Sequence, residues 1–311
     1  MSSTQQRVVI LGRNGQVGRA LSKRLCGNTM SLSRDEADLS QPESLPNILD
    51  NCQPAIIFNA AAYTAVDKAE EEESLATTIN GAAVETLAKY AFDHNIPFIH
   101  YSTDYVFPGD GTTPWEETDA TGPLSAYGRS KLAGEERIKA LAANYTNPKW
   151  LIFRTSWVFD EEGANFVNTM LRLAKEREVL SVVADQIGAP TYAGDIATLS
   201  IEAAQKAEKM VQFPSGIYHL CNSSETSWHE FAETIFTQAT SLGAQLAIKE
   251  VHPIPASDYP TPAARPANSR MSLHKLHNTF DITPPHWQNA LERSLKNRLA
   301  MEQHAAKSIT S

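Results

Sequence analysis

The segment Val8-Val-Ile-Leu-Gly-Arg-Asn-Gly-Gln-Val-Gly18 is the most informative part of this 311-residue chain. Its first four residues form a continuous apolar run, which is typical of a parallel strand buried on both faces. Gly12, Gly15 and Gly18 follow at three-residue spacing and lead into a helix that we expect from Gln16. Glycines here permit a tight turn and let a pyrophosphate approach the amides at the helix N-terminus. The segment therefore predicts a dinucleotide site; a plain strand-to-helix turn is the alternative.

Strands and helices alternate along the first half of the chain. After the strand at 8–11 we expect strands over 29–33, 55–58, 97–101 and 150–153, and helices over 16–25, 42–51, 66–94 and 125–143. This alternation predicts an α/β fold with a Rossmann-type doubly wound parallel sheet. The pattern loosens after Arg154, and the proline-rich stretch 253–266 is expected to be an ordered loop over a site.

A second, smaller α/β domain for substrate is therefore expected, built from discontinuous pieces. The predicted boundaries are 1–155 plus about 192–222 for the NAD(P)-binding domain, about 156–191 plus 223–300 for the nucleotide-sugar domain, and 301–311 for a tail.

Composition and charge exclude several classes of protein. A formal net charge of −9 argues against nucleic acid as a bulk partner, because phosphate binding needs a basic face. No apolar run approaches the roughly 18 residues of a membrane span, so no membrane association is expected. Cys26, Cys52 and Cys221 are widely spaced and lack a metal-ligand pattern. They suit a reducing cytoplasm, and we expect no metal site.

The predicted second strand ends at Ser33-Arg34, where NAD-selective folds usually carry an acid for the ribose 2′-hydroxyl. An arginine beside a hydroxyl can instead meet the 2′-phosphate of NADPH, so we expect NADPH to work at least as well as NADH. A solvated arginine is the alternative, and Asp35 and Glu36 keep NADH open. Asp38 and Leu39 follow on the same loop, where they can flank the adenine; an exposed loop acid is the alternative.

Small residues follow the predicted third strand. The segment Asn59-Ala-Ala-Ala-Tyr-Thr64 lets the backbone approach a cofactor, or simply allows close packing of strand on helix. The complete set of predicted cofactor-binding residues is Gly12, Gly15, Gln16, Val17, Gly18, Ser33, Arg34, Asp38, Leu39, Ala60, Ala61, Ala62, Tyr63, Thr64, Tyr101, Tyr127 and Lys131.

The chemistry is expected at Tyr127 and Lys131, which lie four residues apart on one face of a predicted helix. A free tyrosine hydroxyl has a pKa near ~10 and is a sluggish acid at neutral pH. A nearby ammonium favours the phenolate and lowers this pKa. Thr103, which follows the predicted fourth strand, would offer its hydroxyl to the reacting oxygen. A lone threonine there is usually structural, but the three residues together predict a hydride-transfer centre.

Four longer motifs narrow the family. They are Asn59-Ala-Ala-Ala-Tyr-Thr-Ala-Val-Asp-Lys-Ala-Glu70, Tyr101-Ser-Thr-Asp-Tyr-Val-Phe-Pro-Gly109, Phe153-Arg-Thr-Ser-Trp-Val158 and Arg265-Pro-Ala-Asn-Ser-Arg270. Over roughly residues 7–300 the chain resembles the dTDP-4-dehydrorhamnose reductases, a family within the extended short-chain dehydrogenase/reductase superfamily. Tyr63 departs from the pattern, since the family commonly has histidine there.

The resemblance implies NAD(P)H-dependent reduction of the C4 ketone of dTDP-4-dehydro-6-deoxy-L-mannose (dTDP-4-dehydro-beta-L-rhamnose) to dTDP-L-rhamnose, a precursor of cell-wall polysaccharide and lipopolysaccharide. It implies that Tyr127 protonates the C4 oxygen, that Lys131 holds the nicotinamide ribose, and that Thr103 hydrogen-bonds the substrate carbonyl. Asp104 and Trp157 would line the sugar pocket. Such a ketone develops oxyanion charge that a nearby acid and hydroxyl must meet.

Arg265 and Arg270 are expected to bind the nucleotide diphosphate, since arginine offers phosphate a bidentate fork. Structural ion pairing is the alternative for each. Some relatives dimerise through a metal held by acids, one of them on the first helix. The first helix here begins Gly18-Arg-Ala-Leu21 without a carboxylate, so we expect no metal bridge and a monomer or weak homodimer.

Two other functions stay open. A nucleotide-sugar epimerase or dehydratase of the same superfamily would keep the fold, but an epimerase retains its cofactor, whereas a reductase consumes NAD(P)H. Proteins that resemble these reductases also serve as regulatory subunits of methionine adenosyltransferase. The intact Thr103, Tyr127 and Lys131 favour retained chemistry.

Overall fold

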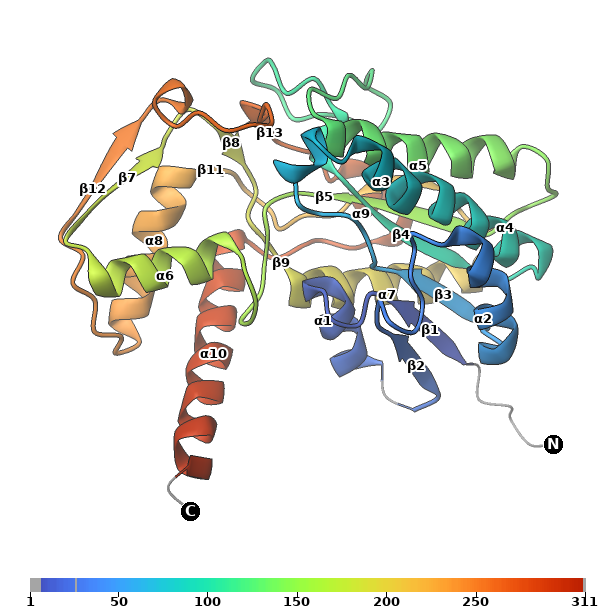
Figure 1. Ribbon diagram of the computed structural model, residues 1–311, viewed down its shortest axis with the longest axis horizontal. Coiled ribbons are helices and arrows are strands. Elements are labelled where there is room, and N and C mark those ends of the chain that lie inside the picture. The colour runs from blue at the N-terminus through green and yellow to red at the C-terminus, as the bar shows by residue number, and fades with distance from the viewer. Residues whose placement is uncertain (1–6, 26, 310–311) are drawn as a thin grey trace.

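The computed structural model describes residues 7–25 and 27–309, and its largest element is a six-stranded sheet (Figure 1). The strand order is β10-β5-β4-β3-β1-β2, and every neighbouring pair is parallel. The strands are β1 (Val8–Leu11), β2 (Thr29–Leu32), β3 (Ile56–Asn59), β4 (Phe98–Thr103), β5 (Trp150–Thr155) and β10 (Gly216–His219). The predicted doubly wound α/β fold is confirmed, and the order reverses at β1, where such folds bind ligands.

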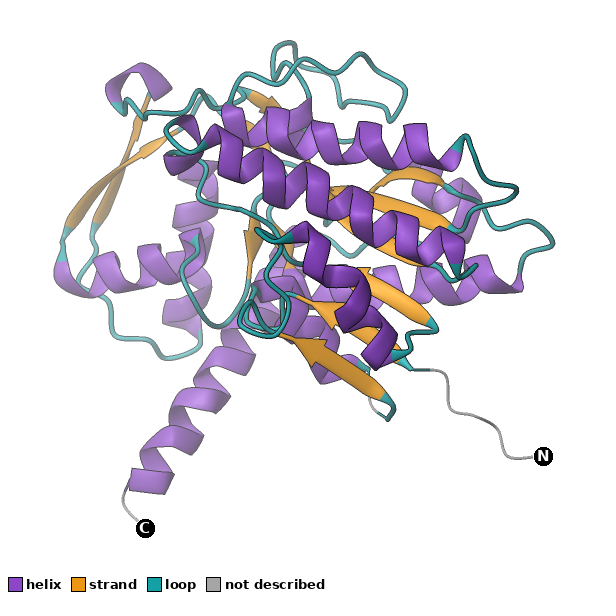
Figure 2. Ribbon diagram, turned by 45° about the vertical axis from the view of Figure 1, so that its right-hand side comes forward, coloured by secondary structure: helices purple, strands orange, loops and turns teal. Residues whose placement is uncertain are grey.

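Helices cover both faces of this sheet (Figure 2). One face packs against α2 (Leu45–Cys52), α4 (Ala83–Asp93) and α5 (Ala126–Ala142), and the other against α1 (Gln16–Arg24), α7 (Ala193–Lys209) and α9 (His274–Phe280). Successive strand side chains point to opposite faces. Val9 and Leu11 therefore enter the first core, while Ile10 enters the second. This is why β1 is apolar at every position.

A second unit, built on its own core around Phe231, lies beside the sheet. It consists of α6 (Phe166–Glu176), α8 (Trp228–Ser241), α10 (Trp287–Ile309), β7 (Val179–Val183) and β12 (Glu250–Ile254). Two small sheets connect it to the six-stranded sheet. In one, β6 (Val158–Phe159) pairs with β9 (Thr191–Tyr192); in the other, β8 (Ile187–Gly188) pairs with both β11 (Thr226–Ser227) and β13 (Asn268–Ser269). The shorter helices are η1 (Pro42–Ser44), η2 (Lys68–Glu70), α3 (Glu73–Thr77), η3 (Thr78–Ala82), η4 (Asp104–Val106) and η5 (Ala256–Asp258).

Two segments differ from the predicted organisation. Within 223–300, which was assigned to the second unit, α9 packs on the sheet because its apolar residues Leu276 and Phe280 complete the core under α7. Within the predicted tail 301–311, α10 continues to Ile309, and residues 310–311 lie outside the described part of the chain.

The described residues include two of the three cysteines. Cys52 and Cys221 are buried free thiols, while Cys26 lies outside the described residues. Across 7–25 and 27–309, no helix is both long and apolar enough to cross a bilayer.

Candidate active site

A cleft of about 1040 Å³ opens along the carboxyl ends of β1 to β5. Its lining includes most of the residues that the sequence analysis selected: Gly12, Gly15, Gln16, Val17, Arg34, Asp38, Leu39, Ala60, Ala61, Ala62, Tyr63, Thr64, Tyr101, Thr103, Asp104, Tyr127, Lys131 and Trp157. Parallel strands present their carboxyl ends at one edge, so loops far apart in the chain meet there.

The glycine-rich loop is packed too closely for side chains. Gly12 has a φ of +87°, and a Cβ on it would lie 2.6 Å from the backbone nitrogen of Ala61. A Cβ on Gly18 would lie 2.0 Å from the carbonyl oxygen of Gly12, so Gly18 serves the turn without lining the cleft. The backbone of Ala60 and Ala61, after β3, is what a Cβ on Gly12 would meet. The first turn of α1 contains no acid, which leaves its amides free to meet an anion. This cradle fits the pyrophosphate of a dinucleotide.

At the end of β2, Arg34 lines the cleft and its side chain is 72% exposed, 3.6 Å from Asp38. Ser33 does not line the cleft. Its hydroxyl and its backbone N–H both donate to Glu36 at 2.7 Å, which lowers the pKa of that carboxyl. Glu36 also pairs with Arg13 at 3.3 Å. Glu36 is thus occupied by Ser33 and Arg13, whereas the guanidinium of Arg34 is accessible to a 2′-phosphate.

Tyr127 lies in the first turn of α5, which is held in place at both its cap and its side. The Ser125 hydroxyl accepts from the N–H of Gly128 at 3.2 Å, and Glu70 accepts from the N–H of Ala126 at 2.8 Å. A Cβ on Gly128 would lie 2.3 Å from the Tyr105 carbonyl oxygen, so α5 approaches η4 closely. The ring of Tyr127 meets that of Tyr105 edge-on, with centroids 5.6 Å apart.

The pKa of Tyr127 differs from the prediction. Burial raises it above its ordinary value of 10, and the neighbouring Thr103 hydroxyl offsets only part of this rise. The ammonium of Lys131 donates to the Tyr101 carbonyl oxygen at 2.6 Å and lies 3.4 Å from His100 Nε2. The predicted lowering of the pKa of Tyr127 is therefore wrong for this structure. Desolvation of the phenolate is the largest cause of the shift, and Lys131 is not among the groups that shift it.

Lys131 is itself only 2% exposed, and burial lowers its pKa to about 8. Behind it, His100 is fully buried, and its Nδ1 lies 3.1 Å from the side-chain nitrogen of Asn59. One turn further along α5, Glu135 forms a buried ion pair with Arg154 through contacts of 3.0 and 2.6 Å, and accepts from the Ser102 hydroxyl. The roles of these polar groups were missed because their burial arises only when α5 packs against the sheet.

Asp104 is a buried carboxylate at the reacting end of the cleft. It is 2% exposed, and its Oδ1 accepts from the Thr103 hydroxyl at 3.1 Å. Its other oxygen has no partner within hydrogen-bond distance among the described residues, although the nearby Ser269 hydroxyl offsets part of the rise in its pKa. Burial raises the pKa of Asp104 to about 6. A carboxyl of this kind is a candidate for contact with substrate hydroxyls.

The two arginines expected to bind the diphosphate do not line the cleft. Arg265 pairs with Asp67 at 2.9 Å and donates to the Tyr105 hydroxyl at 3.3 Å. Arg270 pairs with Glu225 at 2.7 Å. Structural ion pairing, the alternative that the sequence left open, is what the structure contains for both.

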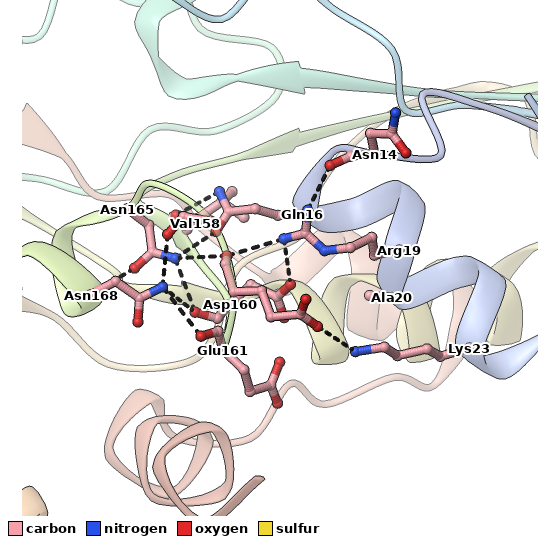
Figure 3. A network of polar contacts seen from close by, with 12 residues as sticks. Asn14, Gln16, Arg19, Ala20, Lys23, Val158, Asp160, Glu161, Asn165 and Asn168 are labelled. Carbon is pink, nitrogen blue, oxygen red and sulfur yellow. Dashed lines mark hydrogen bonds and ion pairs between the residues drawn. The ribbon is translucent and has the colours of Figure 1, made fainter. Parts of the chain in front are cut away.

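The glycine-rich loop is also joined to the second unit (Figure 3). Gln16 Nε2 donates to the Val158 carbonyl at 3.4 Å, and Gln16 Oε1 accepts from Asn165 at 3.0 Å. Arg19 pairs with Asp160 at 3.0 Å. These contacts cross more than 140 residues of sequence, so no local pattern could reveal them. Among the residues described, no group of three or more His, Cys, Asp or Glu side chains could hold a metal ion.

Comparison with known proteins identifies the family of this chain. The family model described as "RmlD substrate binding domain" matches residues 6–300. The chain belongs to the RmlD family. It is 46% identical over 294 residues to the dTDP-4-dehydrorhamnose reductase of Salmonella typhimurium, covering 93% of this chain and 96% of that protein. It is also 46% identical to the reductase of Burkholderia thailandensis, covering 94% and 99%.

Solved structures of other proteins share the architecture. The dTDP-4-dehydrorhamnose reductase of Bacillus anthracis, in complex with NADP, has a TM-score of 0.86 at 34% identity and covers 94% of this chain and 100% of its own. The UDP-glucose 4-epimerase of Thermus thermophilus has a TM-score of 0.75 at 20% identity, covering 94% and 99%, and shows the fold alone. The predicted family is confirmed.

Proposed function

We propose that this protein reduces the C4 ketone of dTDP-4-dehydro-6-deoxy-L-mannose to dTDP-L-rhamnose with NADPH. The observation that carries this proposal is that Thr103, Tyr127 and Lys131 share one cleft with a glycine-rich cradle. Two dTDP-4-dehydrorhamnose reductases that are 46% identical over almost the whole chain support the same reaction.

When bound, NADPH supplies the hydride. Gly12, Gly15 and the amides at the start of α1 hold its pyrophosphate, and Arg34 meets its 2′-phosphate. The NADP-bound relative from Bacillus anthracis supports this choice of cofactor. NADH remains a usable donor, and NADPH should work at least as well, because NADH has no 2′-phosphate for the guanidinium of Arg34 to pair with.

Tyr127 acts as the general acid. Hydride arriving at C4 leaves an electron pair on the carbonyl oxygen, so charge develops there and must be neutralised. The raised pKa of Tyr127 suits this direction of reaction, because the phenol stays protonated until an alkoxide forms beside it. In the described structure the Thr103 hydroxyl donates its single proton to Asp104 Oδ1 at 3.1 Å. With substrate bound, this hydroxyl turns to donate to the C4 oxygen, and Asp104 is then free to accept from a sugar hydroxyl.

Lys131 positions the cofactor and stabilises the product phenolate. Its ammonium is fixed by the Tyr101 carbonyl, one helical turn from Tyr127. There it can bind the nicotinamide ribose and attract the phenolate that remains after proton transfer. Asp104 and Trp157 form the sugar end of the site, as both line the cleft.

The direct test follows loss of NADPH absorbance with dTDP-4-dehydro-6-deoxy-L-mannose generated in situ, and compares kcat/KM with that for NADH. We expect one NADPH consumed per sugar and a kcat/KM with NADPH at least equal to that with NADH. Tyr127→Phe should lower kcat by roughly 10²–10⁴ with little change in NADPH affinity. Tyr145→Phe removes an exposed hydroxyl bonded to Asp93 and should leave kcat unchanged.

Three results contradict the proposal. Near-full activity of the Tyr127→Phe variant shows that Tyr127 is not the general acid. Sugar conversion without net NADPH consumption indicates an epimerase. Normal NADPH binding without any turnover indicates a regulatory subunit.

A further inference from the structure

Trp157 has a backbone conformation that bulky side chains rarely adopt. Its φ is +47°, in the left-handed region. Such residues persist only where surrounding contacts over-determine them, and they concentrate at ligand sites. Trp157 lines the cleft together with Thr103, Asp104 and Tyr127, so the strained residue lies at the reacting end.

The backbone on both sides of Trp157 is tied down. The Ser156 hydroxyl donates to the Ala189 carbonyl at 2.9 Å, and the Trp157 carbonyl accepts from the N–H of Thr191 at 3.1 Å. The next residue, Val158, pairs with Thr191 in the β6–β9 ladder. The conformation is therefore fixed by the strand pairing and not by local preference.

The indole of Trp157 occupies a slot with two walls. On one side it stacks on Trp228, with ring centroids 3.6 Å apart and an interplanar angle of 11°. Gly188 forms the second wall against the benzo part of the ring, where a Cβ would lie 2.7 Å from Trp157 Cε2 and 2.9 Å from the Ser269 Cβ. No side chain larger than hydrogen fits at Gly188 unless the indole moves.

Trp228 is in turn held by the second unit. It is the first residue of α8, and Ser227 and Glu230 form a capping box around it. Its ring also contacts Phe166 of α6, with centroids 4.6 Å apart. Trp228 does not line the cleft, so any influence on the site passes through Trp157.

We propose that Trp228 is a positioning residue for substrate specificity: together with Gly188 it clamps Trp157 so that the indole forms a fixed wall for the deoxysugar ring. This inference rests on the proposed function. The part of the indole that lines the cleft offers an apolar surface to the C–H groups of a 6-deoxysugar, and a wall that is already rigid spares the substrate the cost of ordering it. Without Trp228, the indole can leave the cleft while the nicotinamide side is untouched.

The test separates sugar binding from chemistry and cofactor binding. Trp228→Ala should weaken binding of dTDP-L-rhamnose, measured by calorimetry in the presence of NADP, and raise KM for the ketosugar, each by roughly tenfold or more. The affinity for NADPH should stay unchanged, and kcat should fall less than KM rises. Trp228→Phe should restore most of the sugar affinity, and Gly188→Ala should reproduce the defect from the other wall.

A spectroscopic signature reports the clamp itself. Indoles stacked at 3.6 Å should give an exciton couplet in circular dichroism. The couplet should be lost in Trp157→Ala and Trp228→Ala and kept in Trp150→Phe, which alters a tryptophan in β5. A well-folded Trp228→Ala or Gly188→Ala protein with wild-type affinity for dTDP-L-rhamnose overturns the clamp. So does a couplet that survives in Trp228→Ala. A wild-type protein that neither binds nor turns over the sugar nucleotide instead overturns the proposed function.

Discussion

Asp104→Asn should make the folded protein more stable above pH 6 while impairing its use of the sugar. The carboxyl of Asp104 is 2% exposed, one of its oxygens has no partner among the described residues, and burial raises its pKa from 3.8 to about 6. A group whose pKa is raised on folding binds more protons in the folded state between these two pH values. Stability is therefore lost as pH rises from about 4 to about 6, and the loss persists above that.

The magnitude follows from the pKa. A shift of about two units is worth about 3 kcal/mol at about 1.4 kcal/mol per unit. The unfolding entropy is roughly 2.1 cal/mol/K per residue, so near Tm the unfolding free energy of a chain of this length changes by about 0.65 kcal/mol per degree. A change of about 3 kcal/mol therefore corresponds to about 4–5 °C in Tm. An amide at position 104 does not titrate, so it lacks this pH-dependent loss.

The assay is calorimetric unfolding of wild type and Asp104→Asn at pH 4 and pH 7.5. The Tm of the variant relative to wild type should rise by about 4–5 °C between the two pH values. Any cost of the amide that does not depend on pH cancels in this comparison. Asp93→Asn is the matched control with the opposite sign, because Lys89 and the Tyr145 hydroxyl lower the pKa of Asp93. A Tm difference for Asp104→Asn that is the same at both pH values refutes the buried-carboxylate argument.

Two other predictions concern the groups behind Tyr127. Burial lowers the pKa of Lys131 to about 8, so wild-type kcat/KM should fall as pH rises through about 8. The Lys131→Met variant should be slow at every pH and show no such fall. A wild-type pH profile of kcat/KM that is flat to about pH 9.5 contradicts this prediction. Glu135→Gln should lower the unfolding free energy by roughly 3–5 kcal/mol because it leaves the buried Arg154 unpaired, and the double variant Glu135→Met/Arg154→Met should recover much of this loss. Denaturant unfolding measures both, and a double variant less stable than Glu135→Gln contradicts the assignment.

The sheet and the cofactor cradle were predictable because their signals are local. A run such as Val8–Leu11 is apolar at every position only when both faces of the strand are buried. Gly12 and Gly18 admit no Cβ, and the three-residue spacing already indicates this close approach. The four-residue spacing of Tyr127 and Lys131 places both on one face of α5 wherever that helix packs.

Other features depended on which elements pack together. Arg265 and Arg270 have the chemistry of phosphate ligands. In this structure, however, Arg265 is paired with Asp67, about 200 residues away in sequence, and Arg270 is paired with Glu225, 45 residues away. The spacing indicated an ammonium near Tyr127. The pKa of Tyr127 is nevertheless raised, because its hydroxyl is desolvated, and no sequence pattern reports desolvation. The slot around Trp157 needs Gly188 and Trp228 to converge from β8 and α8. Local sequence encodes conformation and residue chemistry, whereas burial and the partners of charged groups arise only when distant segments meet.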